Sequence, residues 1–366
     1  MRFLRGFAAW VQVRVRALVR GAAPALVPAL VPGLPRTLAR ALALLLLFSA
    51  SLAHATDHAL LIGVADYPNL PRRLWLQGPV NDVALVKTLL LEKGFSANNT
   101  NTLVSRAGPA NEPTRANIVQ SFVSMRARVK PGDRVFFYLA GHGSQQPQPK
   151  DHPGRPTEAD GLDEVFLPAD VQKWDGTGAQ AFIAQALLDD EIGEWIDSLV
   201  DAGAVVWGVF DTCHAAGMAR GPGQGNRQTR SRAVSPAELG IAAAANTPTR
   251  APVSQRLASV STGEGDGMRR VPGTYANGRT DGRSLAFAAR GHEPASEEWL
   301  PRGTSLRGAR MQGVFTWHLV QHLRSDAGSG PASSAALPRA MRATYANEGR
   351  ASPVPQWVNA GKLGWP

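Results

Sequence analysis

The stretches "DRVFFYLAGHGS" (133–144) and "AVVWGVFDTCH" (204–214) decide how the chain is expected to fold. Each is a run of apolar residues that stops at glycine or polar residues, and such runs are typical of strands buried on both faces. The first run leads to His142 between two glycines, and the second leads to Cys213, the only cysteine of the chain. The carboxyl ends of parallel strands meet at one edge of a sheet, so we expect the two side chains to lie within reach of each other.

Strand-like and helical patterns alternate around these stretches. A further buried strand is predicted over 59–67, and a strand with a loop over 283–300. The spacing of apolar residues predicts helices over 80–95, 114–129, 187–203 and 313–326, and one short helix in the tail after Ala327. This alternation predicts an α/β fold with a parallel sheet covered on both faces.

The first 55 residues have the composition of an export signal. They contain seven arginines and no acidic residue, followed by the apolar stretch "ALALLLLFSASLA" and a small-residue pattern that ends at Ala55. The apolar stretch is shorter than the roughly 20 residues that span a membrane. We expect cleavage near Ala55 and export to the periplasm or the medium, with membrane attachment only if the segment stays uncleaved.

The positive charge of the chain lies outside the expected folded part. The formal net charge is +10, and it falls to +3 once the seven arginines of the signal leave. Residues 218–283 hold ten arginines against four acidic residues, in a stretch rich in Gly, Pro, Ser and Thr that indicates a flexible loop. Nucleic-acid binding needs a basic face on the folded part, so we exclude that class of function.

A lone cysteine is either an inert buried residue or a nucleophile. A free thiol in an oxidising compartment is at risk of oxidation, so its retention favours a function. A thiol becomes a strong nucleophile beside a base. His142 is a better candidate for that base than His214, because adjacent residues of an extended segment point to opposite faces. The N–H groups of Gly143 and Cys213 are candidates for an oxyanion hole.

At these residues the chain resembles a known family. The motifs "YLAGHGS" and "FDTCHAAG" resemble the His and Cys motifs of caspase-like cysteine peptidases, in particular of metacaspases and their bacterial relatives. The similarity extends over about residues 58–325 and includes "LLIGVADY", "LQGPVNDVALVKTLL", "DGLDEVFLPAD", "LLDDEI" and "GVFTWHLVQHL". It implies a caspase-like three-layer sandwich with a mostly parallel sheet of about six strands. It also implies a division into the signal (1–55), a large-subunit region (56–217), a linker loop (218–283) and a small-subunit region (284–366).

The resemblance implies a cysteine endopeptidase with Cys213 as nucleophile, His142 as base and a thioester acyl-enzyme. It implies cleavage after Arg or Lys, with Asp82 and Asp211 lining the pocket for that side chain, which we call S1. Asp211 lies two residues before Cys213 and shares its face, and a partly buried carboxylate pairs best with a guanidinium. A charge near a helix N-terminus is the alternative role for Asp82. The expected partners are proteins or peptides with a basic residue at the cut, and no cofactor is required.

Two further expectations follow from the same resemblance. Calcium activates many metacaspases, which makes Asp160, Asp163, Asp189 and Asp190 candidate ligands, although an acidic helix start explains the last two equally well. The linker arginines closest to Cys213 are expected to be exposed, so that an arginine-specific enzyme could cut its own chain there; they are Arg220, Arg227, Arg230 and Arg232.

The chain departs from the family pattern in three places near the expected S1 pocket. "CHAAG" stands where the family usually has C-H-S-G, Ala140 replaces a common Ser, and Pro79 replaces a common Cys. A catalytically weak domain that binds peptides is therefore the main alternative to an endopeptidase. A transpeptidase or an amidase would share the same two catalytic residues.

Overall fold

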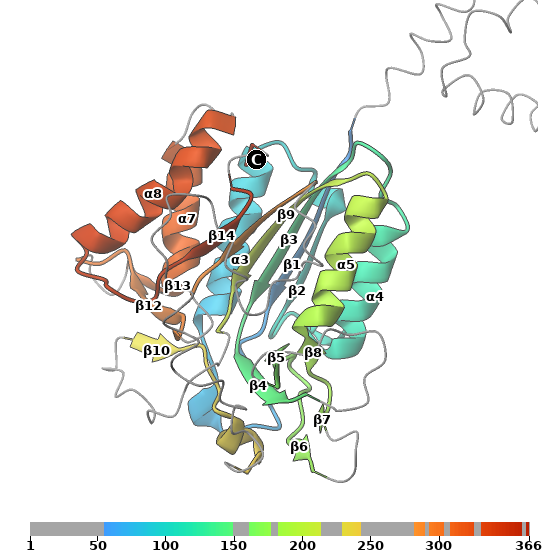
Figure 1. Ribbon diagram of the computed structural model, residues 1–366, viewed down its shortest axis with the longest axis vertical. Helices are drawn as coiled ribbons and strands as arrows, with labels where there is room; N and C mark the ends of the chain where they lie inside the picture. Colours follow the sequence, from blue (N-terminus) through green and yellow to red (C-terminus); the bar gives the residue numbers. More distant parts are fainter. Residues whose placement is uncertain are drawn as a thin grey trace, which may run out of the picture. The chain divides into compact units, whose positions relative to one another are not determined.

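A six-stranded sheet forms the centre of the part of the chain that the structure describes (Figure 1). This computed structural model describes residues 55–148, 161–176, 182–213, 229–242, 282–289, 293–303, 308–325, 331–360 and 364–365. The strands lie in the order β14–β11–β9–β3–β1–β2. Their bounds are β1 Asp57–Gly63, β2 Thr100–Val104, β3 Arg134–Ala140, β9 Val205–Asp211, β11 Arg283–Phe287 and β14 Gln356–Val358.

The pairing of these strands confirms the predicted fold class. Every neighbouring pair is parallel except β11 with β14, which is antiparallel. Strands β3 and β9 pair from Arg134 with Val205 to Ala140 with Asp211, so they end side by side. The two stretches that lead to His142 and Cys213 therefore leave the same edge of the sheet.

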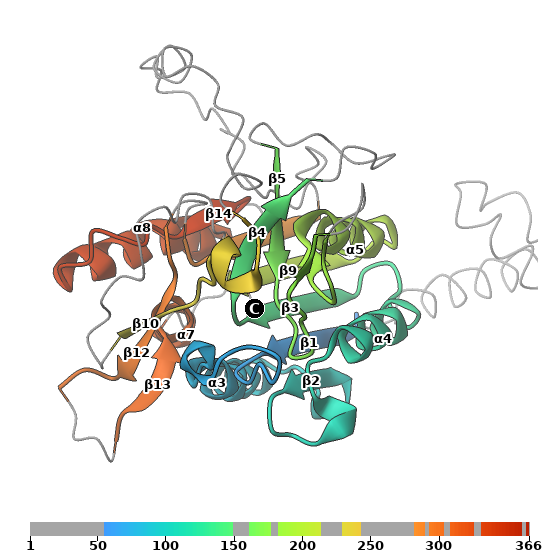
Figure 2. The same cartoon turned by 90° about the horizontal axis from the view of Figure 1, so that it is seen from below.

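Helices cover both faces of the sheet (Figure 2). One face carries α3, α7 and α8, and the other carries α4 and α5 (Figures 1 and 2). Their bounds are α3 Gly78–Glu92, α4 Arg115–Arg126, α5 Asp189–Asp201, α7 Val314–Ser325 and α8 Pro331–Asn347. The prediction of a layer of helices on each face is confirmed.

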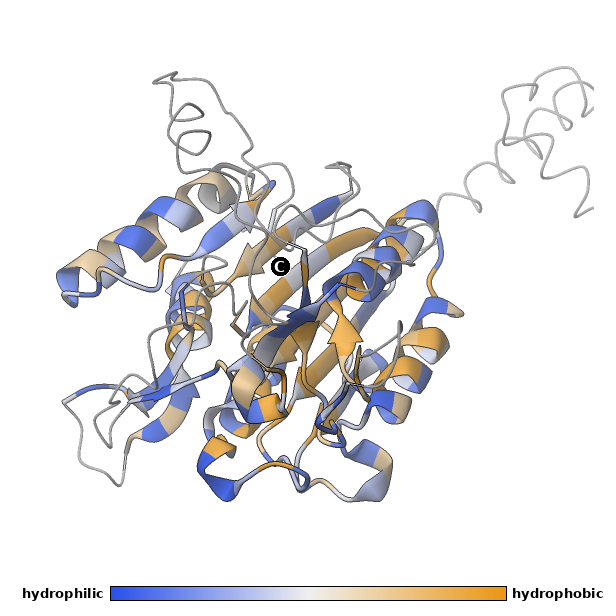
Figure 3. Cartoon of the chain, turned by 60° about the horizontal axis from the view of Figure 1, so that its bottom comes forward, coloured by the Kyte–Doolittle hydropathy of each residue, from blue (hydrophilic) through white to orange (hydrophobic). Residues whose placement is uncertain are grey.

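Alternation along the strands builds two hydrophobic cores, one on each face. In β3, Phe137 and Leu139 belong to the core under α4 and α5, whereas Phe136 and Tyr138 belong to the core under α3 and α7. Successive strand residues point to opposite faces, so a strand that is buried on both faces has to be apolar throughout. Figure 3 shows the resulting hydrophobic bands along the central strands.

Short strands extend the fold beyond the sheet edge where β3 and β9 end. Two three-stranded sheets lie there in the orders β10–β12–β13 and β4–β5–β8, and β6 pairs with β7. The bounds are β4 Gly143–Pro147, β5 Leu162–Phe166, β6 Trp174–Asp175, β7 Phe182–Ile183, β8 Leu187–Leu188, β10 Thr229–Ser231, β12 Ser296–Leu300 and β13 Arg310–Gly313. The 3-10 turns are η2 Arg72–Leu74, η3 Ala97–Asn99, η4 Pro109–Asn111 and η5 Pro236–Leu239.

The structure differs from the sequence-based expectations in the linker and in the tail. Residues 229–242, expected to be loop, contain β10 and η5, because β10 adds a strand to β12 and η5 buries Leu239. The tail helix α8 is longer than predicted and includes Pro338, and β14 was not predicted. Among the described residues, no helix combines the length and the apolar character that crossing a membrane requires.

Candidate active site

His142 and Cys213 lie at the ends of neighbouring strands. Each follows the last pair of the β3–β9 ladder, Ala140 with Asp211, by two residues. Both side chains are buried, each with 1% of its surface exposed. The sequence-based reasoning placed both residues at this edge, and the register of the two strands brings them there.

Hydrogen bonds fix which nitrogen of the His142 ring can act as a base. Nε2 lies 2.5 Å from the carbonyl oxygen of Leu74, to which it can only donate. Nδ1 is therefore the nitrogen without a proton, and it has no hydrogen-bond partner among the described residues. The backbone N–H of His142 donates to the hydroxyl of Tyr67 at 2.8 Å, and that hydroxyl donates to the carbonyl of Val64 at 3.2 Å.

Burial sets the resting protonation of the two side chains. It lowers the pKa of His142 to about 4 and raises the pKa of Cys213 to about 12. At neutral pH the resting pair is therefore an imidazole and a thiol, without charge. Hydrogen bonding with the backbone of Arg232 opposes both pKa shifts. The sulfur of Cys213 also accepts from the N–H of Ala295 at 2.9 Å.

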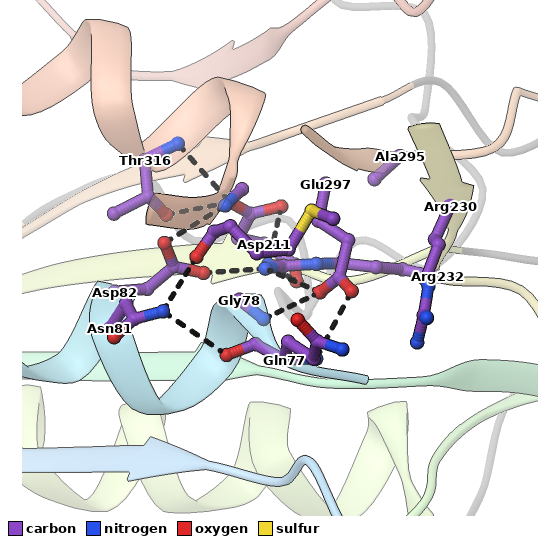
Figure 4. Close-up of polar contacts among 12 residues, drawn as sticks. Gln77, Gly78, Asn81, Asp82, Asp211, Arg230, Arg232, Ala295, Glu297 and Thr316 are labelled. Carbon is purple, nitrogen blue, oxygen red and sulfur yellow. Dashed lines mark hydrogen bonds and ion pairs between the residues drawn. The ribbon is translucent and has the colours of Figure 1, made fainter. Parts of the chain in front are cut away.

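A buried guanidinium occupies the predicted S1 pocket. Nη2 of Arg232 lies 2.5 Å from Oδ2 of Asp82, and Nη1 lies 3.0 Å from Oδ1 of Asp211. All three side chains have 0% of their surface exposed, and Figure 4 shows them converging. The expectation that Arg232 lies exposed in a loop is wrong, because its side chain turns inward to two carboxylates. Arg230, in the preceding strand β10, is exposed.

The start of helix α7 fixes the direction of both carboxylates. Gly313 donates its backbone N–H to Oδ1 of Asp82 at 2.9 Å. Thr316 donates to Oδ2 of Asp211 from its backbone at 3.1 Å and from its hydroxyl at 2.6 Å. A Cβ atom on Gly313 would collide with the carboxylate of Asp211. These contacts give the G-x-x-T pattern of "GVFT" a physical role in shaping S1.

Helix α3 brings the opposite wall of the pocket. Besides Asp82, it contributes Asn81, whose side chain donates to the carbonyl of Met311 at 2.8 Å and so ties α3 to β13. A Cβ atom on Gly78 would lie only 2.6 Å from the Glu297 carboxylate and 2.7 Å from the guanidinium of Arg232. The glycine of the "LQGPVND" motif therefore makes room for the occupant of S1.

Glu297 is a third carboxylate of S1 that the sequence-based reasoning missed. It is fully buried, lies 3.8 Å from Nη2 of Arg232, and accepts the N–H groups of Gln77 at 3.1 Å and Gly78 at 2.8 Å (Figure 4). Its segment, "SEEWL", is charged and follows a loop, so the sequence pattern predicts that it lies on the surface. Only the pairing of β10 with β12 shows that this position faces the pocket.

The carboxylates outnumber the cation in this pocket. Burial raises the pKa of Asp82 to about 7, with the neighbouring charge of Asp211 adding to the rise and that of Arg232 opposing it. Burial also raises the pKa of Glu297, while the pKa of Arg232 is held well above its usual value by the three carboxylates despite burial. A desolvated pocket with this excess of negative charge selects a cation.

The backbone of Gly143 faces the carbonyl group of Arg232. Its N–H donates to that oxygen at 3.1 Å, which is the contact expected of an oxyanion-hole donor. A Cβ atom on Gly143 would collide with the carbonyl of Cys213. Only glycine therefore allows the two strand ends to approach this closely.

The candidate calcium ligands do not form a site among the described residues. Asp163 lies in β5 opposite Gln146, and Asp189 and Asp190 begin α5. In the described ranges, no group of three or more His, Cys, Asp or Glu side chains is arranged so that it could hold a metal ion. Asp160 lies outside those ranges, as do His214, Arg220 and Arg227, so calcium binding stays a prediction.

Comparison with known proteins places this arrangement in context. Residues 57–222 match the family model for the metacaspase, peptidase C14 domain. Metacaspase-1 of Candida albicans is 32% identical over 161 residues, which cover 44% of this chain and 33% of that protein. Metacaspase-1A of Aspergillus oryzae is 33% identical over 167 residues, covering 45% and 36%. The chain thus spans about a third of the length of these relatives.

Protein GSU0716 from Geobacter sulfurreducens superposes with a TM-score of 0.49 at 19% sequence identity, over 85% of this chain and 94% of that one.

Proposed function

We propose, from the match of residues 57–222 to the metacaspase, peptidase C14 domain, that the chain is a caspase-like cysteine endopeptidase that cuts after arginine or lysine. In this proposal Cys213 is the nucleophile and His142 the base. Asp82 and Asp211 recognise the basic side chain, and Glu297 assists them. The substrates are proteins or peptides that present such a residue in an extended segment.

One observation carries the proposal. An arginine side chain lies between Asp82 and Asp211 while its own carbonyl oxygen accepts from Gly143, next to Cys213. A peptidase needs this combination, because the residue before the cut must place its side chain in S1 and its carbonyl at the nucleophile in one pose. Arginine gains most from such a pocket, since its planar group can pair with two carboxylates at once.

The proposed reaction uses the neutral resting pair. Nδ1 of His142 takes the thiol proton as Sγ of Cys213 attacks the carbonyl carbon, and the carbonyl oxygen gains negative charge against the N–H of Gly143. His142 then gives the proton to the leaving amine as the C–N bond breaks, which leaves a thioester. Water hydrolyses the thioester, giving a carboxylate and restoring the thiol. The bond from Nε2 to Leu74 keeps Nδ1 directed to this task.

We place this activity outside the cytoplasm, on the basis of the export signal predicted over residues 1–55. Calcium is a candidate activator of this peptidase, and its candidate ligands are Asp160, Asp163, Asp189 and Asp190. The test below therefore includes an arm with calcium.

The test is turnover of short fluorogenic peptides that end in Arg, Lys, Asp or Asn. The full chain and C213A are compared, each with and without millimolar calcium, over several hours so that a delayed onset is seen. Turnover of the Arg and Lys peptides that is lost in C213A is the expected result. Turnover of the Asp or Asn peptide instead would overturn the assignment of Asp82 and Asp211 while keeping the catalytic pair.

The alternative function is a peptide-binding module without efficient catalysis. The burial of Cys213, which raises the pKa of its thiol to about 12, favours this alternative. Alkylation by iodoacetamide separates the two functions once S1 has been emptied by R232Q. A binder's thiol stays slow to react, whereas a peptidase gains both thiol reactivity and turnover.

A further inference from the structure

The first residues of the folded part are held at the edge of the central sheet that lies opposite the candidate active site. Strands β1 and β3 lie side by side (Figure 1), and their ladder begins with Asp57 paired with Arg134, at the end of β3 that is remote from His142. Ala55 is exposed, whereas Thr56 is half-buried. Packing of the chain therefore begins at Thr56, directly after the predicted export signal.

Asp133 is a buried carboxylate that accepts three hydrogen bonds at this point. Its Oδ1 accepts the backbone N–H of Thr56 at 2.8 Å. Its Oδ2 accepts the backbone N–H of Lys130 at 2.8 Å and Nε2–H of His58 at 3.3 Å. Burial alone would raise the pKa of Asp133, but these donors outweigh burial and lower the pKa. The carboxylate is therefore charged at neutral pH.

The charge of Asp133 has no permanent cation beside it in the part of the chain that the structure describes. No Lys or Arg side chain pairs with Asp133 there, and His58 carries a charge only when it is protonated. The guanidinium of the next residue, Arg134, is bound by both oxygens of the Asp57 carboxylate. A buried carboxylate is costly unless a positive charge balances it. Of its two backbone donors, only the nitrogen of Thr56 can gain such a charge, by becoming the first atom of the chain.

The contacts that follow Thr56 fix its nitrogen at this carboxylate. The carbonyl oxygen of Thr56 accepts the N–H of Arg134 at 3.0 Å, and the ion pair between Asp57 and Arg134 holds the next residue. These contacts come from residues 56 and 57 alone. The nitrogen of Thr56 is thus held beside Asp133 whether or not another residue precedes it.

We propose that Thr56 is the first residue of the mature protein and that its α-ammonium group binds Asp133 as a buried ion pair. Hydrolysis of the Ala55–Thr56 bond by a signal peptidase consumes one water molecule, leaving a carboxylate on Ala55 and an ammonium group on Thr56. The nitrogen that donated one neutral N–H to Oδ1 then carries a positive charge and three donors. This inference rests on the predicted export signal and is independent of the proposed peptidase activity.

The ion pair gives removal of the signal a structural consequence. Hydrogen bonds between charged groups are stronger than those between neutral groups, so the mature chain gains stability that its precursor lacks. The precursor is therefore easier to unfold until the signal has been removed. Because the ammonium group lies at the sheet edge remote from His142, this gain affects folding and leaves the geometry of the catalytic pair unchanged.

Thermal unfolding of three chains tests the inference. They are the full chain, a chain that begins at Ala55 and a chain that begins at Thr56, each released from a removable fusion partner and each carrying C213A so that it stays whole. The unit Thr56–Pro366 is compact and contains both hydrophobic cores, so the shortest chain has all that folding requires. We expect its Tm to lie about 2–4 °C above that of the other two.

Two variants show whether Asp133 causes this difference in Tm. In D133N the carboxylate is neutral, so the chains that begin at Ala55 and Thr56 should unfold at the same temperature. The matched control is D66N, which breaks the ion pair with Arg106 beyond the other end of β1 and should leave the difference in Tm unchanged. A difference in Tm that persists in D133N, or that is absent from the unsubstituted chains, would overturn the inference.

The reaction of the α-amine with cyanate tests the ion pair without relying on stability. Only the uncharged amine reacts, so an ion pair that raises the amine pKa by one unit slows the reaction about tenfold near pH 7. Mass spectrometry of the N-terminal peptide follows the rate. We expect slow reaction at Thr56, an ordinary rate at Thr56 in D133N, and an ordinary rate at Ala55 in either background. An ordinary rate at Thr56 in the unsubstituted chain would contradict the ion pair, and neither readout involves peptide turnover.

Discussion

The replacement D211N tests most directly whether S1 recognises a positive charge. The carboxylate of Asp211 lies 3.0 Å from the guanidinium in S1, and Thr316 holds it from two donors. Asparagine keeps the size of the side chain and one acceptor for Thr316, so the change mainly removes a charge. The effect should therefore appear as a loss of preference for charged over neutral side chains of the same shape.

The size of the effect follows from the burial of the group. Removing one partner of a buried ion pair costs about 3–5 kcal/mol. Asp82 and Glu297 remain beside the guanidinium, so we expect the lower part of that range or less, about 2–3 kcal/mol. At about 1.4 kcal/mol for each factor of ten, this corresponds to a loss of about 30- to 150-fold.

The assay compares kcat/KM for two peptides that end in arginine or in citrulline, its neutral isostere. Both peptides are measured on the same preparation, so the ratio of their kcat/KM values does not depend on the fraction of enzyme whose S1 is free. D211N should lower this ratio by the factor above. The matched control is D133N, which changes a buried carboxylate at the other end of β3, where Asp133 accepts the N–H of Thr56 at 2.8 Å. If the ratio of kcat/KM for arginine to that for citrulline stays at the wild-type value in D211N, the carboxylate of Asp211 does not recognise the positive charge of the substrate.

Three further predictions concern pH, the support of His142 and the space in S1. Burial raises the pKa of Asp82 to about 7, so protonation below that pH removes a negative charge from S1. The ratio of kcat/KM for the arginine peptide to that for the citrulline peptide should therefore rise as the pH increases through about 7. D82N should flatten this part of the pH profile. Y67F removes the hydroxyl that joins the N–H of His142 to the carbonyl of Val64, so urea unfolding should show a loss of about 1–3 kcal/mol, and kcat should fall with KM nearly unchanged. G313A places a methyl group against the carboxylate of Asp211 and the guanidinium in S1, and we expect a loss of about 1–3 kcal/mol in stability together with a loss of arginine-peptide turnover. Wild-type turnover in G313A would refute the described pocket geometry.

The sequence was sufficient for those parts of the site that strand ends determine. Continuous apolar runs identify β3 and β9, and the rule that parallel strands end at one edge brings His142 and Cys213 together. The family resemblance assigns Asp211 to S1, and its spacing to Cys213 agrees, since alternate residues share a face. The placement of His142 and Cys213 needs only local pattern and the direction of the chain.

The parts that were missed depend on contacts between distant segments. Arg232 and Glu297 both come from polar, charged stretches, which local pattern assigns to the surface. β10, which directly precedes Arg232, pairs with β12, which contains Glu297, and this pairing joins positions 67 residues apart, Arg230 and Glu297. The same pairing explains why part of the predicted linker is a strand: its hydrogen bonds come from a partner that the local sequence does not reveal.

The charge balance in S1 argues that Arg232 is a ligand rather than a permanent structural ion pair. Three buried carboxylates face one guanidinium, and Nε of Arg232 has no hydrogen-bond partner among the described residues. A structural pair is stable when its charges balance and its donors are satisfied, because each desolvated charge or unpaired group is costly. The carboxylates, in contrast, are each held by backbone donors that remain when the guanidinium departs. The pocket is thus built to keep its shape without Arg232 and to be occupied by an arginine, whichever chain supplies it.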